Sequence, residues 1–247
     1  MAETIRYDFG ADAPQTVLQG FEGIPAGGRF ALNLAPGADA TVYVLQEGRA
    51  LTGELSADYA ITLGEGASLR MVFVALGGAA PMRTSLHIEM AGRHASCRLG
   101  GLYLAAETQE IDFSVLLRHA VPECFSSQLF KGILRDAAHT RFDGLIYVAP
   151  DAQKTEAYQA NHNLLLSADA RAEARPQLEI YADDVKCSHG ATVGRLNEDE
   201  LFYLRSRGIT AAEAARLQQM AFVGEVLEMV ADTALRDRLT ALVLEKL

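Results

Sequence analysis

The sequence changes character within residues 183–209, DDVKCSHGATVGRLNEDELFYLRSRGI. The pattern before this stretch is typical of strands and turns, and the pattern after it is typical of helices. If residues 185–193 form a strand, its side chains alternate between two faces, so Cys187 and His189 share one face about 7 Å apart. A thiol and an imidazole are half of a four-coordinate soft-metal site. A second chain, or a distant part of this one, would have to complete it.

The sequence before residue 183 consists of short alternating or apolar runs separated by glycine- and proline-containing turns. The predicted strands are residues 41–45, 59–63, 68–76, 84–90, 97–104 and 111–117, with a further edge strand at residues 5–9. Strands that follow one another at intervals of roughly ten to fifteen residues, with no helical segment between them, indicate an all-β body. A sandwich and a solenoid both fit this pattern.

A loose internal repeat favours the solenoid. Residues 136–147 resemble residues 169–180 at an offset of about 33, and residues 130–134 resemble residues 161–165 at an offset of about 31. In a parallel β-solenoid each coil stacks on the preceding one and buries an aliphatic row, which explains such a repeat. We therefore predict a β-solenoid.

Three helices are predicted after the last strand. Asn197 is an N-cap residue with a glutamate three positions later, and Gly208 stands where a left-handed residue would end the first helix. Thr210 and Glu213 form a capping box that opens a longer helix. Asp232 is the expected cap of a third helix.

Composition excludes several classes of function. The 247 residues include 22% charged and 49% hydrophobic residues and carry a net charge of −10, which argues against a nucleic-acid-binding surface. The longest apolar stretch, residues 71–82, is interrupted by two glycines and a proline and is shorter than the ~20 residues of a membrane-spanning helix. The chain has no P-loop motif, so we expect it to bind no nucleotide itself. Three cysteines without a Cys-x-x-Cys pair, and no signal pattern, favour the cytoplasm.

The stretch quoted above resembles the C-terminal signature of the SufB/SufD family, the scaffold subunits of the Suf iron–sulfur cluster assembly system. The resemblance lies in KCSHGATVG, an acidic spacer and LFYLRSRGI, and it extends less densely from about residue 130 to about residue 230. The Cys-Ser-His-Gly-Ala-Thr run is similar to the SufD half, whereas SufB-type chains carry Glu-His-Glu-Ala-Thr. Asn161 stands where SufB-type chains carry a cysteine that is a proposed cluster ligand.

The resemblance implies a right-handed parallel β-helix followed by a small C-terminal α-helical domain. The expected division is an N-terminal strand or arm at residues 1–29, a β-helix core at residues 30–196 and a helical domain at residues 197–247. SufD-type chains are much longer and begin with a helical domain, so we expect a short form lacking it. Either one kind of subunit serves both halves as a homodimer, or the chain is a paralogue that has lost the cluster role.

The implied function is that of a scaffold and not of an enzyme. A SufD-like subunit would pair with a SufB-like chain or with itself, and would bind the SufC ATPase through its helices. His189, and with it Cys187, would be ligands for a transient iron–sulfur cluster at the dimer interface. The expected partner-binding residues are Leu201, Phe202, Leu204, Arg205, Arg207 and Phe222. Removing residues 197–247 is expected to abolish ATPase binding and to leave a folded β body.

Structural interpretations stand beside these roles. Cys187 could be a small packed residue next to a hydrogen-bonded His189. Asn161 and Asn163 are expected to form an amide ladder on one strand face, with His162 pointing to solvent. The remaining thiols and imidazoles are expected to be structural: Cys97, Cys124, His94, His119 and His139. Cys124 would handle sulfur only if it were exposed with a lowered pKa.

Two other functions are possible on the sequence. A β-helical enzyme acting on a polysaccharide would need a carboxylate groove, which Asp183, Asp184 and the acidic residues within 107–112 could supply. The absence of tryptophan for sugar stacking argues against it. An adaptor for an ATPase without a cluster role would differ only in that Cys187 and His189 would not matter.

Overall fold

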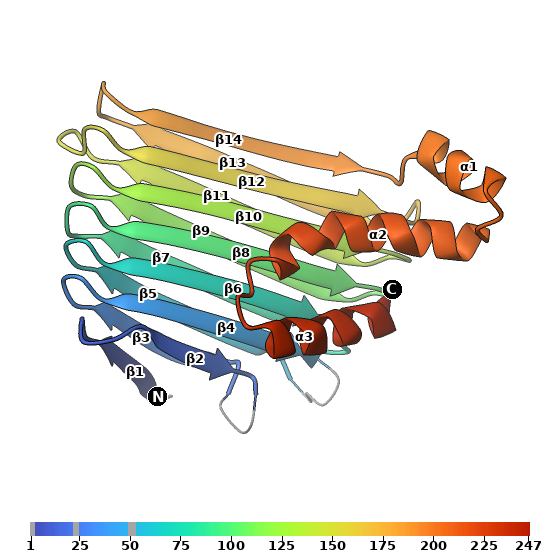
Figure 1. The fold of residues 1–247 in the computed structure, drawn as a ribbon, viewed down its shortest axis with the longest axis horizontal. Helices are drawn as coiled ribbons and strands as arrows, with labels where there is room; N and C mark the ends of the chain where they lie inside the picture. Colours follow the sequence, from blue (N-terminus) through green and yellow to red (C-terminus); the bar gives the residue numbers. More distant parts are fainter. Residues whose placement is uncertain (1–2, 22–24, 49–52) are drawn as a thin grey trace.

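The computed structural model describes residues 3–21, 25–48 and 53–247, in which the chain is mainly β (Figure 1). The odd-numbered strands form one seven-stranded sheet: β1 (Thr4–Phe9), β3 (Gly28–Leu34), β5 (Leu55–Leu63), β7 (Met82–Met90), β9 (Glu110–His119), β11 (His139–Val148) and β13 (Arg171–Ile180). The even-numbered strands form the other: β2 (Gln15–Gln19), β4 (Asp39–Glu47), β6 (Ser68–Leu76), β8 (Ser96–Ala105), β10 (Phe125–Leu134), β12 (Glu156–Leu165) and β14 (Lys186–Gly194). Three helices follow: α1 (Glu198–Ser206), α2 (Ala211–Leu227) and α3 (Thr233–Lys246).

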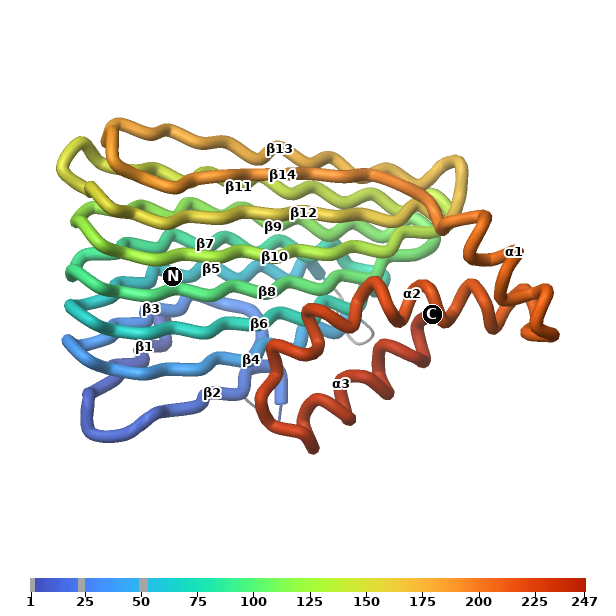
Figure 2. The backbone as a smooth tube through the Cα atoms, turned by 45° about the horizontal axis from the view of Figure 1, so that its top comes forward, coloured from blue at the N-terminus to red at the C-terminus, as the bar shows by residue number. Residues whose placement is uncertain are grey.

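The chain winds as a β-solenoid. Consecutive strands alternate between the two sheets, and the strands that pair within a sheet are parallel. Figure 2 shows the coils stacked from β1 and β2 at one end of the molecule to β13 and β14 at the other. The predicted solenoid is confirmed, and the sandwich is excluded.

The register confirms one of the two predicted offsets and corrects the other. Strands β10 and β12 pair at an offset of 31 residues. The second offset is wrong by one residue, because Leu145 pairs with Gln177 and not with Leu178. A shift of one residue moves a side chain to the other face of a strand. The true register places Ile146 beside Leu178 in a buried apolar cluster.

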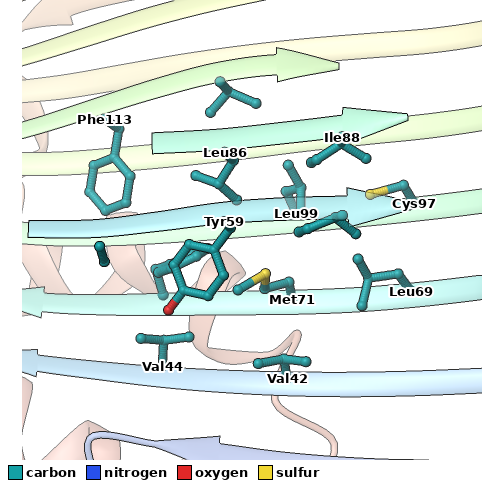
Figure 3. Close-up of a cluster of buried hydrophobic side chains, with 14 of the residues drawn as sticks. Val42, Val44, Tyr59, Leu69, Met71, Leu86, Ile88, Cys97, Leu99 and Phe113 are labelled. Carbon is teal, nitrogen blue, oxygen red and sulfur yellow. The ribbon is translucent and has the colours of Figure 1, made fainter. Parts of the chain in front are cut away.

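The interior of the solenoid is filled by inward-facing apolar side chains, among them Tyr59, Met71, Leu99 and Phe113 (Figure 3). Burial in β5 alternates strictly along the strand, because the outer face of the odd-numbered sheet meets water. Strand β6 instead has six consecutive buried residues, 71–76, because its outer face is also covered.

The left-handed backbone conformation recurs in the turns from β3 to β4, β5 to β6, β7 to β8, β9 to β10 and β11 to β12. These turns have positive φ at Gly37 (73°), Gly66 (63°), His94 (60°), Glu123 (62°) and Lys154 (58°). Glycine adopts this conformation without steric cost, and the later coils adopt it with larger residues. His94 is therefore a turn residue, as the structural interpretation expects.

The helices begin at the predicted caps. The side chain of Asn197 accepts hydrogen bonds from the backbone of α1, Thr210 and Glu213 form a reciprocal capping box on α2, and Asp232 caps α3. Residues 195–197 alone connect β14 to α1. No helix of the described residues is long and apolar enough to cross a membrane.

Helices α2 and α3 cover the outer face of the even-numbered sheet (Figure 1). The shared cluster includes residues from the strands, Tyr43, Leu45, Val72, Val74, Leu76, Leu102, Leu104 and Ile133, and residues from the helices, Val223, Val226, Leu227, Leu239 and Val243. The hydroxyl of Tyr43 also accepts a hydrogen bond of 3.0 Å from the backbone N–H of Ala231. The two helices and the solenoid therefore share one apolar core.

The first and last parts of the chain differ in how they join the solenoid. Strands β1 and β2, from the predicted N-terminal arm, pair with β3 and β4 and so belong to the two sheets. Helix α1 extends beyond the ends of the strands, and none of its residues is buried (Figure 1). The division into three domains stays a prediction.

Candidate functional site

The C-terminal end of the solenoid is open. Strand β14 pairs only with β12, and β13 pairs only with β11, so each of these two strands has one edge without a partner in the described chain. Three large apolar side chains are exposed at this end: Ile180 (39%), Tyr181 (57%) and Val193 (49%). An unpaired strand edge flanked by exposed apolar side chains is a place for another chain to pair.

Cys187 and His189 lie on the inward-facing side of β14 at this open end. In register, Cys187 pairs with buried Ala157 and His189 pairs with buried Gln159 on β12. Cys187 is half-buried against an apolar cluster, whereas His189 is exposed. The structure thus brings the two side chains to one face, and their role as ligands stays a prediction.

Cys187 and His189 supply only two ligands, so a metal site at this position would need further ligands from another chain. Burial raises the pKa of the Cys187 thiol, and a hydrogen bond to the backbone of Ala157 only partly opposes this effect. The thiol is therefore protonated at neutral pH, and a metal ion would have to displace this proton in order to bind. No group of three or more His, Cys, Asp or Glu residues in the described parts of the chain is placed to hold a metal.

A column of buried glutamines lies directly beneath His189. Gln128 and Gln159 occupy the same inner position on β10 and β12, and Gln159 Nε2 donates a hydrogen bond of 3.1 Å to Gln128 Oε1. This column was not predicted. The repeat offset of 31 residues would have revealed it, because that offset relates Gln128 to Gln159 and ends one residue from His189.

Asn161 and Asn163 share the inner face, and they form a closed ring of hydrogen bonds with Tyr103. Asn161 Nδ2 donates to the Tyr103 hydroxyl (2.8 Å), which donates to Asn163 Oδ1 (2.7 Å). Asn163 Nδ2 returns to Asn161 Oδ1 at 2.8 Å. The two side chains share one strand face, as expected, but their partner is a tyrosine two coils away and not a ladder of amides. Gly132 on the intervening strand leaves the space for that tyrosine.

His162 lies on the opposite, outer face of β12. Its Nδ1 is 2.7 Å from the Thr192 hydroxyl, and the ring is half-buried instead of fully solvated. Burial, together with the nearby charge of Lys131, lowers the pKa of His162. The residue therefore links β12 to the outer face of β14.

The other thiols and imidazoles have structural positions. Burial raises the pKa of Cys97 to about 12 and also raises that of buried Cys124, so Cys124 lacks the exposure and lowered pKa that sulfur handling requires. His119 is buried with its Nε2 2.9 Å from the Ser126 hydroxyl. The half-buried His139 pairs with Glu173 at 3.3 Å.

The expected partner-binding residues differ in how accessible they are. Phe202 is 74% exposed, and both arginines of this set are exposed. Leu201 and Leu204 are half-buried. Phe222 lies on α2 with its ring centroid 4.9 Å from Lys131 Nζ. A groove of about 480 Å³ runs between α1, α2 and the ends of β12 and β14, and its lining includes Leu204 and Phe222.

Comparison with known proteins identifies the family. The family described as "SUF system FeS cluster assembly, SufBD core domain" matches residues 10–222. This chain belongs to the SufB/SufD family. It is 36% identical over 248 residues to the iron–sulfur cluster assembly protein SufD of Escherichia coli (strain K12), an alignment that covers 97% of this chain and 57% of the relative.

Two other relatives agree with this assignment. An iron–sulfur cluster assembly SufBD family protein of Mycobacterium leprae is 38% identical over 76% of this chain and 49% of its own length. The protein ABCI7, chloroplastic, of Arabidopsis thaliana is 36% identical over 63% of this chain and 33% of its own length. The chain spans about half the length of the first two SufB/SufD relatives.

The carboxylates considered for a polysaccharide-acting enzyme do not form one groove. Asp183 and Asp184 lie in the turn between β13 and β14, whereas Glu107 lies in the turn between β8 and β9. These turns are at opposite ends of the strands, because one leads from an odd-numbered to an even-numbered strand and the other leads back. A strand of ten residues separates such turns by about 30 Å. This separation does not support a polysaccharide-cleaving site built from these two groups of carboxylates.

Proposed function

We propose that this chain is a SufD-like scaffold subunit of iron–sulfur cluster assembly. In this function it catalyses no reaction itself and works in the cytoplasm. The observation that carries the proposal is the position of His189 and Cys187 at the open end of the solenoid, beside two strand edges that have no partner in the described chain. A site built there is completed when another chain covers that end.

The partner at the open end is a SufB-like chain or a second copy of this one. Strands of a chain with the same fold can continue both sheets by pairing with the free edges of β13 and β14. The exposed side chains of Ile180, Tyr181 and Val193 would be buried in the same step. Ligands from the partner would then face Cys187 and His189.

The second partner is an ATPase of the SufC type, which docks on α1 and on the groove between α1 and α2. Helix α1 stands clear of the solenoid and presents the exposed ring of Phe202. The exposed Arg205 and Arg207 lie at its C-terminal end, where the Arg207 guanidinium stacks on the ring of Tyr203. A large aromatic residue and arginines are the residue types that dominate binding energy at interfaces. Because the chain carries no P-loop, the nucleotide is bound by the partner.

The cluster is the cargo of this scaffold and not a resident cofactor. Thiolate and imidazole are suitable ligands for iron in clusters. A single thiol with a raised pKa and one exposed imidazole hold such a cargo weakly. Weak ligation suits a scaffold that has to release what it assembles.

The proposal is tested by co-expression with a SufC-type ATPase in the absence of a SufB-like chain, followed by anaerobic size-exclusion chromatography with light scattering. A complex of two scaffold chains and two ATPases is expected if a copy of this chain serves as the pairing partner. A one-to-one complex would assign that place to a SufB-like chain, and the experiment is then repeated with it present.

Two matched substitutions separate the two surfaces. Phe202→Asp and Val193→Asp each place a carboxylate on an exposed apolar side chain, 74% and 49% exposed, one on α1 and the other on β14. Phe202→Asp is expected to release the ATPase and preserve pairing, and Val193→Asp is expected to do the reverse. If each variant retains both partners, the assignment of these surfaces is wrong.

An adaptor without a cluster role is the second candidate, since the half-buried Cys187 is packed in an apolar cluster. The two candidates differ in whether His189→Asn lowers cluster content in the complex while binding of the ATPase stays unchanged.

A further inference from the structure

Two polar groups at the end of the glutamine column are complementary and lack partners. Gln159 is 3% exposed, and its Oε1 is buried without a hydrogen bond. His189 occupies the same position on the next strand and makes no side-chain hydrogen bond with the described residues. A buried acceptor without a donor is costly, and an imidazole N–H is a donor.

The orientation of the Gln159 amide leaves its oxygen for the coil that carries His189. The Nε2 atom of Gln159 donates to Gln128 Oε1, in the coil on the other side. Oxygen and nitrogen lie on opposite sides of an amide group, so the oxygen is the atom directed away from that coil. Neighbouring strands are about 4.8 Å apart, a distance that the exposed side chain of His189 can span by rotating.

The opposite sheet leaves room for this amide. Gly144 on β11 faces Gln159 across the interior, and a Cβ atom added to it would lie 2.4 Å from Gln159 Nε2 and 2.8 Å from Gln159 Cδ. Any larger residue at this position would displace the amide. The glycine and the hydrogen bond to Gln128 together fix where the Gln159 oxygen lies.

We propose that Gln159 is a positioning residue for His189: its amide oxygen accepts a hydrogen bond from one ring nitrogen and leaves the other free to bind a soft metal ion. The inference rests on the proposed role of His189 as a ligand. Histidines that bind metals usually donate their second N–H to a carbonyl or a carboxylate, which fixes the tautomer and the orientation of the ring.

The first test measures the tautomer of His189 by long-range ¹H–¹⁵N correlation spectra of the full chain at pH 8. The chain has six histidines, and the spectrum of His189→Asn identifies the signals of this one. One tautomer is expected to dominate in the wild type. In Gln159→Met, which keeps the length of the side chain but removes the amide acceptor, the populations should approach those of free histidine. Gln159→Glu keeps an acceptor and should retain the wild-type tautomer.

Gln219→Met is the matched control. Its amide oxygen is likewise buried without a partner, but it lies on α2. This variant should leave the His189 signals unchanged. Far-UV circular dichroism and urea midpoints report whether each variant folds. Gln159→Ser, whose side chain is too short to reach His189, replaces Gln159→Met if that variant does not fold. Tautomer populations that are the same in the wild type and in a folded Gln159→Met would overturn the inference.

The second test measures Zn²⁺ binding by competition with a chromophoric chelator and separates the inference from the proposed function. His189→Asn is expected to abolish binding at this site, and Gln159→Met to weaken it about 10-fold or more. If Zn²⁺ binding is weakened by His189→Asn but not by Gln159→Met, the positioning role fails and the ligand role stands. If His189→Asn binds Zn²⁺ as the wild type does, the ligand role fails, and the inference fails with it.

Discussion

Lys131 Nζ lies 2.6 Å from Glu225 Oε2, and this ion pair joins strand β10 to helix α2. The lysine side chain is only 9% exposed, whereas the glutamate side chain is 63% exposed. The ammonium group also lies 4.9 Å from the ring of Phe222. The pair therefore holds a nearly buried charge under a helix that we propose takes part in docking the ATPase.

Substitution of Glu225 and substitution of Lys131 should reduce the free energy of unfolding by different amounts. Glu225→Gln leaves the buried ammonium without its counter-charge, so we expect a loss of about 1–2 kcal/mol in the free energy of unfolding, less than for a fully buried pair. Lys131→Met fills the site with an apolar chain of similar length and should cost less. Urea denaturation of both variants checks the order. Glu228→Gln, an exposed change on the same helix end, serves as the control, and equal losses from the two variants would contradict the prediction.

Gly132→Ala should destabilise the chain by about 1–3 kcal/mol or more, the usual cost of overpacking a core. The added Cβ atom would lie 2.0 Å from Tyr103 Cε2 and 2.5 Å from Asn163 Oδ1, so it would break the ring of hydrogen bonds inside the solenoid. Thermal and urea unfolding measure the loss. Gly190→Ala is the matched strand substitution, because its Cβ would meet nothing within 4 Å. Comparable losses in both variants would show that the ring of hydrogen bonds does not contribute.

The stability of the chain should depend on the protonation of His119. Burial lowers the pKa of His119 from 6.5 to about 4. Between these values the unfolded chain binds a proton that the folded chain does not, so the free energy of unfolding falls as the pH falls from 6.5 to 4. Above pH 6.5 the contribution is fully present. His119→Gln, which can still bond to Ser126, should reduce this slope by up to about 1.4 kcal/mol per pH unit.

Urea denaturation at several pH values between 4 and 7.5 tests this dependence. Parallel curves for the wild type and His119→Gln would show that His119 does not cause the dependence.

The sequence led us to expect a folded β body after removal of residues 197–247, but the structure leads us to expect aggregation. Helices α2 and α3 cover Tyr43, Val72, Leu102 and other apolar residues of the even-numbered sheet. A chain truncated after residue 196 would expose this cluster to water and should bind a hydrophobic dye and aggregate. Removal of α1 alone requires no such exposure, because none of its residues is buried. Light scattering of the truncated chain provides the measurement, and a monodisperse, folded product would contradict the expectation.

Local patterns predicted the three helices and favoured the solenoid, which the resemblance to the SufB/SufD family also implied. Each prediction used a pattern visible in a short part of the sequence. These patterns are the alternation in strands such as β5, the 31-residue repeat, and the caps at Asn197 and Thr210. The sequence also indicates that the outer face of β6 is covered. Its continuous apolar run at residues 71–76 is typical of a strand buried on both faces. The prediction treated that run only as a strand.

Other features depend on contacts that a single coil does not determine. Tyr103 meets Asn163 only because the residue between them in the stack is Gly132. The exposure of His189 depends on the fact that, among the described residues, no further coil follows β14, which is a property of the whole stack. The pairing of Lys131 with Glu225 spans 94 positions of sequence and joins two different kinds of element.

The three-residue connection between β14 and α1 gives the molecule a mechanical property. A force applied to α1 passes through residues 195–197 to β14, with little slack to absorb it. Within the described chain β14 is hydrogen-bonded along one edge only, so it can shift against β12 by breaking a single row of hydrogen bonds, whereas an inner strand would have to break two. Tension on α1 would therefore displace β14, the strand that carries Cys187 and His189, before it displaces an inner strand.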